Sequence, residues 1–315
     1  MRLLVVGAGA IGSLFGAKLL EAGQEVTLVA RGAHGDALRK EGLRIEGETV
    51  RVYHPSVVGE IPPATQTDGV LLCVKTFDLL LASEMIGRAV VRPVPTLALQ
   101  NGLNIEPIVT EALRIGGWEH PESWVVRAVN SVPSRWVAPG RVQQTGTGEV
   151  LLPAPSRSGA AAHSELFRSA LEGAGIPVRL VDSIDREVWR KALLNAAINP
   201  LTAAHGLTNG ELLNEPWAAE ARRLLREAQL AAHFAGYDFV DAEVDADLQR
   251  VLRATAANHS SMAQDLELGR PTEIDAISGA IVRTALAHRT RLPATEQMIS
   301  LILQKTGKSA ASSAS

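Results

Sequence analysis

Three polar side chains recur at a spacing of four residues in a segment that is otherwise apolar. Lys191, Asn195 and Asn199 lie within the sequence WRKALLNAAINPLTA. On an α-helix this spacing places them on one face, with a drift of only ~40° per step. Because an ammonium and two amides are not buried without partners, the stripe is expected to line a cleft. One cation and two neutral amides suit a carbonyl or carboxylate substrate.

A glycine-rich turn near the N-terminus offers a second kind of chemistry. It consists of Gly7, Ala8, Gly9, Ala10, Ile11 and Gly12. An apolar strand pattern at 2–6 precedes it, a helical pattern follows from about position 11 to 22, and a second strand is predicted at 25–30. In such a βαβ unit the first glycine permits a tight turn, the second lets a pyrophosphate approach the helix N-terminus, and the third allows close helix–strand packing. The placement predicts a dinucleotide site.

The residues at the strand ends indicate which dinucleotide binds. An NAD site usually has an acidic residue at the end of the second strand, where it holds the ribose 2′-hydroxyl. Positions 28–33 contain no acid, and Arg31 offers a guanidinium suited to a 2′-phosphate. We therefore predict NADP(H) as the cofactor. Lys75 and Asn101 follow further predicted strands, at 69–74 and 95–99, and are expected at the same edge of the sheet.

The order of strand and helix patterns predicts two domains. Further strands are predicted at 43–46, 50–53, 124–129 and 177–181, with a hairpin-like pair at 141–145 and 148–152 around Gly146 and Gly148. After Ser183, helical patterns rich in Ala, Leu, Arg and Glu take over. We expect an α/β domain over 1–183 with a doubly wound parallel sheet of the Rossmann type, an all-α domain over 184–305, and a disordered tail over 306–315.

Composition and charge exclude several classes of function. The chain has 315 residues, of which 46% are hydrophobic and 21% charged, and a net charge of −3. It lacks the basic field of a nucleic-acid-binding protein, and no stretch approaches the ~20 apolar residues of a membrane span. The single cysteine, Cys73, is expected to be an inert buried thiol in a cytoplasmic protein. The eight histidines form no HxH or HExxH pair, so no metal site is predicted.

Three polar features of the helical half are candidates to complete a substrate site. Asn209 lies in an NGEL turn before a predicted helix. Ser261 lies within a helical pattern that begins near position 245. Glu273 falls in the first turn of a predicted helix, with Thr272 and Asp275 in capping-box spacing.

Each of these features also has a purely structural interpretation. Lys191 could extend its ammonium to solvent, and the asparagines could cap neighbouring helix ends. Lys75 and Asn101 could be ordinary loop residues, the glycine turn could be structural alone, and Glu273 could be a surface carboxylate that interacts with a helix dipole. Their combination in one chain favours a catalytic site.

Together these motifs resemble those of the ketopantoate reductase (2-dehydropantoate 2-reductase) family. The matching stretches run in family order from residue 5 to about 283 and are VVGAGAIGSLFGAKL with Arg31, VKTFD, LQNG, EVWRKALLNAAINPLTA, TNGEL and NHSSMAQDLELGRPTEID. The resemblance implies a Rossmann domain, a helical domain similar to the C-terminal domain of 6-phosphogluconate dehydrogenase, and an active site in the cleft between them. It also implies NADPH-dependent reduction of 2-dehydropantoate to (R)-pantoate, a step toward pantothenate and coenzyme A.

The resemblance further implies roles for individual residues. Those that would bind NADPH are Gly7–Gly12, Arg31, Lys75 and Asn101, with Asn101 also near the substrate. Lys191 would be the general acid, because its ammonium can stabilise the charge that builds on the carbonyl oxygen and then deliver the proton. Those that would hold the substrate are Asn195, Asn199, Asn209 and Ser261. Glu273 would contact the cofactor ribose or pair with Lys191.

One stretch departs from the family pattern and leaves the substrate open. Arg127 and Trp136 lie near positions where family members usually have small residues, and Ser134 is the best match to the small residue that contacts the cofactor. A paralogous NADP-dependent reductase of another 2-oxo or 3-hydroxy acid is therefore one alternative, and a non-catalytic NADP-binding sensor is another. The apolar helix predicted at 276–287 could form the seam of a homodimer or belong to the core.

Overall fold

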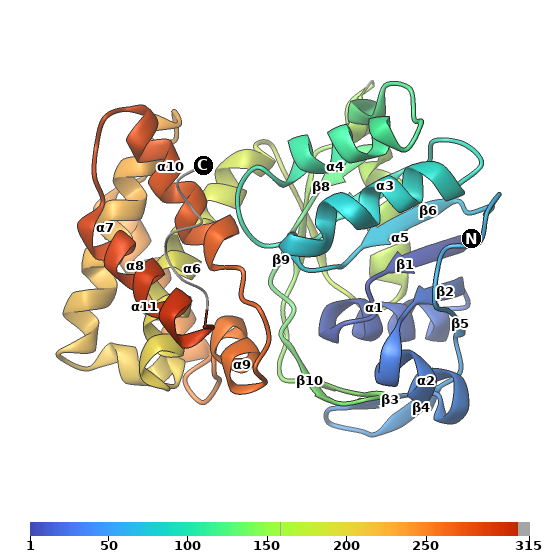
Figure 1. The fold of residues 1–315 in the computed structure, drawn as a ribbon, viewed down its shortest axis with the longest axis horizontal. Helices are drawn as coiled ribbons and strands as arrows, with labels where there is room; N and C mark the ends of the chain where they lie inside the picture. The colour runs from blue at the N-terminus through green and yellow to red at the C-terminus, as the bar shows by residue number, and fades with distance from the viewer. Residues whose placement is uncertain (158, 308–315) are drawn as a thin grey trace. The chain divides into compact units, whose positions relative to one another are not determined.

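Two compact units make up the chain (Figure 1). The structure is a computed structural model that describes residues 1–157 and 159–307. The first unit comprises residues 1–100 and 104–184, and the second comprises Asn101–Leu103 together with the chain from Asp185 onward. Most of the predicted tail, residues 308–315, lies outside the described residues.

The first unit alternates strands with helices. Its strands are β1 (Arg2–Val6), β2 (Glu25–Val29), β3 (Leu43–Glu46), β4 (Arg51–Tyr53), β5 (Ser56–Val58), β6 (Gly69–Leu72), β7 (Thr96–Ala98), β8 (Val125–Arg127), β9 (Val129–Asn130), β10 (Ser134–Ala138), β11 (Arg141–Gln144), β12 (Val150–Pro153) and β13 (Val178–Val181). Its helices are α1 (Ala10–Glu21), α2 (Gly32–Glu41), η1 (Thr76–Asp78), α3 (Leu79–Ala89), α4 (Ile105–Ile115), η2 (Pro121–Ser123), η3 (Ala160–His163) and α5 (Ser164–Gly173).

A parallel sheet in the order β5-β2-β1-β6-β7-β8 forms the centre of this unit. Side chains alternate between its two faces, so Leu3 and Val5 of β1 belong to one core while Leu4 and Val6 belong to the other. Helices α1 and α5 contribute to the first core, and α3 and α4, which lie side by side in Figure 1, contribute to the second. Burying each such side chain contributes ~1.5–3 kcal/mol. The predicted doubly wound α/β fold is confirmed.

The hairpin predicted at 141–145 and 148–152 is wrong. Strand β11 pairs with β10 and β3, whereas β12 pairs with β9 and β13 in a separate three-stranded sheet. The hairpin turns instead at Gly140, whose φ of 72° suits a glycine. Gly148 permits a close approach of two backbone segments, because a Cβ there would lie 2.4 Å from the carbonyl oxygen of Ser131.

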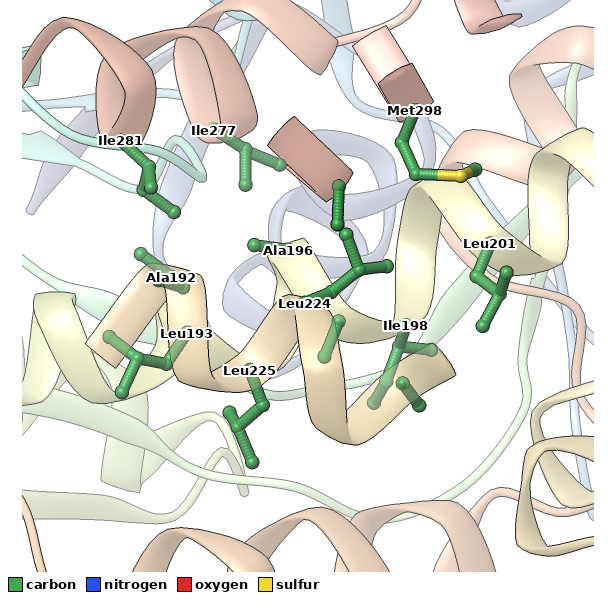
Figure 2. Close-up of a cluster of buried hydrophobic side chains, with 14 of the residues drawn as sticks. Ala192, Leu193, Ala196, Ile198, Leu201, Leu224, Leu225, Ile277, Ile281 and Met298 are labelled. Atoms are coloured by element: carbon green, nitrogen blue, oxygen red, sulfur yellow. The ribbon is translucent and has the colours of Figure 1, made fainter. Parts of the chain in front are cut away.

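All the regular secondary structure described after residue 183 is helical. Its helices are α6 (Ile184–His205), η4 (Asn209–Leu213), α7 (Trp217–Phe234), α8 (Asp241–Ala254), α9 (Ser261–Glu267), η5 (Asp275–Gly279), α10 (Ala280–Ala287) and α11 (Pro293–Lys305). Side chains from α6, α7, η5 and α10 converge in one core, among them Leu193, Leu225, Ile277 and Ile281 (Figure 2). The apolar segment 276–287 thus contributes to this core, and a homodimer stays a prediction.

Two further observations bear on the chemistry available to the chain. Burial raises the pKa of the Cys73 thiol to about 12, which agrees with an inert cysteine because the thiolate is the reactive form. None of the described helices has both the length and the apolar character needed to cross a bilayer.

Candidate functional site

Two glycines of the turn between β1 and α1 are required by packing within the protein. Gly7 has a φ of 98°, and a Cβ there would lie 2.6 Å from the backbone nitrogen of Val74. A Cβ on Gly12 would lie 2.1 Å from the carbonyl oxygen of Gly7. Any side chain at either position would therefore displace the backbone around the turn.

Gly9 has no such internal reason to be a glycine. Nothing lies within 4 Å of the position its Cβ would take, and the residue is the N-cap of α1. No side chain caps this helix, and its first turn carries no acidic residue. The helix N-terminus therefore offers backbone amides and a positive dipole to an anion that approaches over Gly9. These features fit the pyrophosphate of a dinucleotide.

Two cationic side chains follow the strands on either side of β1. Arg31 follows β2 and Lys75 follows β6, and both strands flank β1 in the sheet. Arg31 is exposed, and its Nε donates to the carbonyl oxygen of Gly59 at 3.2 Å. Lys75 is half-buried at the start of η1. The structure thus brings both residues and the glycine turn to the carboxyl edge of the sheet, where doubly wound sheets bind ligands.

Ser134 lies in a second sheet of the first unit, which packs against α1. It begins β10, which belongs to the four-stranded sheet β10-β11-β3-β4 rather than to the main parallel sheet. Its Oγ is buried and has no hydrogen-bond partner within the described part of the chain. The structure does not place it at a strand end beside the glycine turn, so its contact with a cofactor stays a prediction.

The polar stripe lies on one continuous helix, α6, as the spacing predicts. Lys191 and Asn195 are half-buried, and Asn199 is 6% exposed. Between them, Ala192 and Ala196 are buried in the core of the second unit (Figure 2). Around Lys191 and Asn195 one side of α6 is packed and the other is partly open, whereas every residue from Ala196 to Ala204 is buried, Asn199 included.

Ser261 begins a helix of its own, so its predicted position in the middle of a helix is wrong. Helix α8 ends at Ala254, and Ser260, in an extended conformation, is the N-cap of α9. The Oγ of Ser260 accepts a hydrogen bond from the amide of Ala263 at 3.2 Å and lies 2.8 Å from the Oγ1 of Thr202 on α6. The cap thus ties the start of α9, where Ser261 is exposed, to the helix that carries the stripe.

Asn209 is buried in a turn that its neighbours hold in place. Its Nδ2 donates to the Oγ1 of Thr255 at 2.9 Å, and Glu211 accepts a hydrogen bond from the amide of Thr208 at 2.7 Å. That backbone hydrogen bond, joined by one from the Thr208 hydroxyl, lowers the pKa of Glu211. The Oδ1 of Asn209 is buried without a partner in the described chain. Such an acceptor costs ~1–3 kcal/mol unless it is satisfied.

Glu273 is buried, so its interpretation as a surface carboxylate is wrong. It is 6% exposed, and the Nδ2 of Asn101 donates to its Oε2 at 3.4 Å. Leu103 also donates to the carbonyl oxygen of Ala276 at 3.0 Å, which fixes segment 101–103 within the second unit. No side chain caps the helix that follows Glu273, so the capping box expected at 272–275 is absent from this described segment.

Sequence reasoning missed the side chains that support these residues. Thr202 and Thr255 lie 58 and 46 residues from their partners, and no spacing could indicate those contacts. Arg127, which lies near positions where family members usually have small residues, is 6% exposed and donates to the carbonyl oxygens of Ala98 and Ala128 at 3.1 and 2.9 Å. The apolar run WVVRAV around this arginine could have indicated its burial. A buried guanidinium needs acceptors, which the backbone carbonyl oxygens provide.

Comparisons with known proteins decide the family. Models described as "Ketopantoate reductase PanE/ApbA" and "Ketopantoate reductase PanE/ApbA C terminal" match residues 3–157 and 183–306. The chain belongs to the ketopantoate reductase family. A 2-dehydropantoate 2-reductase of Archaeoglobus fulgidus is 32% identical over 286 residues, which cover 90% of this chain and 90% of the relative.

Solved structures of the ketopantoate reductase family and of a dehydrogenase share the fold. A PanE/ApbA family ketopantoate reductase from Ralstonia eutropha JMP134 has a TM-score of 0.86 at 30% identity, covering 98% of this chain and 99% of its own. A D-mandelate dehydrogenase bound to NADH and anilino(oxo)acetate has a TM-score of 0.90 at 24% identity and 98% coverage of both chains, which shows the common architecture. The present chain is an oxidoreductase that acts on a CH–OH group.

The glycine turn yields a paired prediction. Gly9→Ala should leave the melting temperature within ~2 °C of the wild type, because its Cβ meets open space at an ordinary φ. It should nevertheless raise the calorimetric Kd for NADPH about tenfold or more by blocking the pyrophosphate. Gly12→Ala is the matched control. Unlike Gly9→Ala, it should lower the free energy of unfolding, by ~1–3 kcal/mol. Unchanged NADPH affinity in Gly9→Ala would mean that the cofactor does not approach there.

Proposed function

We propose that the chain reduces 2-dehydropantoate to (R)-pantoate with NADPH, a step toward pantothenate and coenzyme A. The observation that carries the proposal is the stripe on α6, where one ammonium and two amides occur on a helix whose other side is buried core. Relatives named 2-dehydropantoate 2-reductase, at 32% and 30% identity over 90% and 96% of this chain, support the same substrate.

Lys191 is the proposed general acid. NADPH, when bound, supplies the hydride that reduces the ketone carbon. As negative charge develops on the carbonyl oxygen, the Lys191 ammonium stabilises it and delivers the proton. Losing one oxyanion-hole donor costs ~3–4 kcal/mol in other enzymes, and a cation that also donates a proton is expected to contribute at least as much.

The amides and hydroxyl of the second unit orient the substrate in this proposal. These residues are Asn195, Asn199, Asn209 and Ser261. Because they are neutral, they can bind the carboxylate and hydroxyl groups without a second positive charge that would compete with Lys191.

Glu273 completes the proposed catalytic group. Its carboxylate is buried and accepts from Asn101, so a nearby positive charge would stabilise it. We assign to it one of two roles, which are to keep Lys191 charged and aimed at the carbonyl oxygen or to contact the cofactor ribose. Asn101 is assigned to both the cofactor and the substrate.

The cofactor in this proposal is NADPH rather than NADH. The exposed guanidinium of Arg31 directly after β2, and the lack of an acid at positions 28–33, support recognition of a 2′-phosphate. Gly7–Gly12 would hold the pyrophosphate, and Lys75, Asn101 and Ser134 are the further residues assigned to cofactor binding.

The proposed function is tested by following NADPH oxidation at fixed enzyme with 2-dehydropantoate and a short panel of other 2-oxo acids, and NADP reduction with 3-hydroxy acids. We expect the highest kcat/KM with 2-dehydropantoate. A higher value with another acid would identify a paralogous reductase. Tight NADPH binding without oxidation by any acid would identify a sensor.

Substitution of Lys191 tests the proton donor. Lys191→Ala should lower kcat ~10²–10⁴-fold, the usual contribution of a general acid, while the Kd for NADPH stays within about twofold. Lys191→Arg, which keeps the charge but holds its proton too tightly to act as an acid, should remain below ~10% of wild-type kcat. Near-normal turnover in either variant would rule out the role.

Substitution of Arg31 tests the cofactor choice. Arg31→Ala should raise KM for NADPH about tenfold or more and change KM for NADH less than about threefold, because only NADPH carries the 2′-phosphate. Arg39→Ala, on the helix α2 that follows Arg31, is the control, since that arginine pairs with Asp36 at the surface. Equal effects of Arg31→Ala on the two cofactors would contradict the assignment.

A further inference from the structure

A buried amide continues the hydrogen bonding of the main sheet beyond the end of its strands. Gln100 lies two residues after β7 and is 6% exposed. The backbone ladder between β6 and β7 ends where Leu99 donates to the carbonyl oxygen of Leu72 at 3.3 Å. Past that point the side-chain Nε2 of Gln100 donates to the carbonyl oxygens of Leu72 and Val74 at 2.8 and 3.2 Å. Beyond the carboxyl ends of β6 and β7, a side chain thus makes the hydrogen bonds that the backbone makes within the sheet.

The acceptor Val74 is held from two sides. On one side Gln100 binds its carbonyl oxygen, and on the other the backbone nitrogen of Val74 approaches Gly7 so closely that a Cβ there would lie 2.6 Å away. Lys75 is the next residue and begins η1. The direction in which Lys75 leaves the sheet is therefore set by the glycine turn and by the Gln100 amide together.

The amide oxygen of Gln100 indicates that this residue does more than stabilise the fold. Its Oε1 is buried and has no hydrogen-bond partner in the described structure. An unsatisfied buried acceptor is a cost that an apolar side chain of similar size avoids. Gln100 also directly precedes Asn101, which contacts Glu273. The amide thus lies beside the loop that carries Lys75 and directly before Asn101 in the chain.

We propose that Gln100 is a positioning residue of the cofactor site, which aims Lys75 through the carbonyl oxygens of Leu72 and Val74. It does not contact the cofactor itself. The inference rests on the proposed function, because it takes NADPH as the ligand of this edge. Without the two hydrogen bonds, the Lys75 ammonium samples more orientations, and ordering it on binding costs affinity. The chemical step of the loaded enzyme is unchanged, so KM rises and kcat does not.

The test compares two substitutions on the same strand. Gln100→Met keeps the length of the side chain and removes both donors. Thr96→Val is the matched control at the opposite end of β7, where the fully buried Thr96 Oγ1 donates to the carbonyl oxygen of Val94 at 3.1 Å. We expect both to lower the melting temperature by a few degrees. Only Gln100→Met should raise the calorimetric Kd and the KM for NADPH about tenfold, with kcat within about twofold of the wild type.

A double-mutant cycle shows whether the effect passes through Lys75. If it does, Gln100→Met should change the Kd for NADPH far less in a Lys75→Ala background than alone. Additive effects, or equal changes of Kd in Gln100→Met and Thr96→Val, would overturn the positioning role. If the wild-type chain binds no NADPH, the proposed function and this inference fail together. If the wild type binds NADPH and Gln100→Met binds it equally well, only this inference fails.

Discussion

The burial of one side of α6 is the constraint on which the proposed catalytic residues depend. Small and branched apolar side chains, among them Ala192, Ala196 and Leu193, pack against α7 and the run from η5 to α10 (Figure 2). Because these side chains are buried in one cluster, turning α6 about its axis would expose them, and this holds the helix in one orientation. Its four-residue polar spacing then determines which way the ammonium and amides face. Glu273 is placed by the same core, because Ile277, one turn later, belongs to it.

Features with short sequence spacing were predicted well. The βαβ unit needs only the pattern of some thirty residues, and the structure has β1, α1 and β2 within one residue of the predicted ranges. The stripe on α6 needs only helical geometry. The carboxyl ends of parallel strands lie at one edge of a sheet. The sequence alone therefore predicts Arg31 and Lys75 at the same edge. In each case the information lies within one element or in a general rule of α/β folds.

Features that depend on distant partners could not be predicted. The pairing of β11 and β12 is decided by β3, β9 and β13, and two adjacent strand patterns with a glycine between them gave the wrong answer. Ser261 was misplaced because the cap at Ser260 is coupled to Thr202, 58 residues away along the chain. The burial of Glu273 is likewise invisible in its neighbours, since the residue that reaches it is Asn101, 172 positions earlier. A buried carboxylate is a better candidate for a catalytic residue than a carboxylate on the surface near a helix end, so the burial of Glu273 favours its proposed role.

Segment 101–103 makes the two halves of the gene unsuitable for independent exchange. The segment is encoded within the first half, yet Leu103 bonds to Ala276, and a Cβ on Gly102 would lie 2.5 Å from the Ala276 carbonyl oxygen. A chimaera joined near residue 184 would set a foreign π-helical turn against this inherited tripeptide. Such a chimaera keeps the contact only where the second parent leaves the same space opposite residues 101–103.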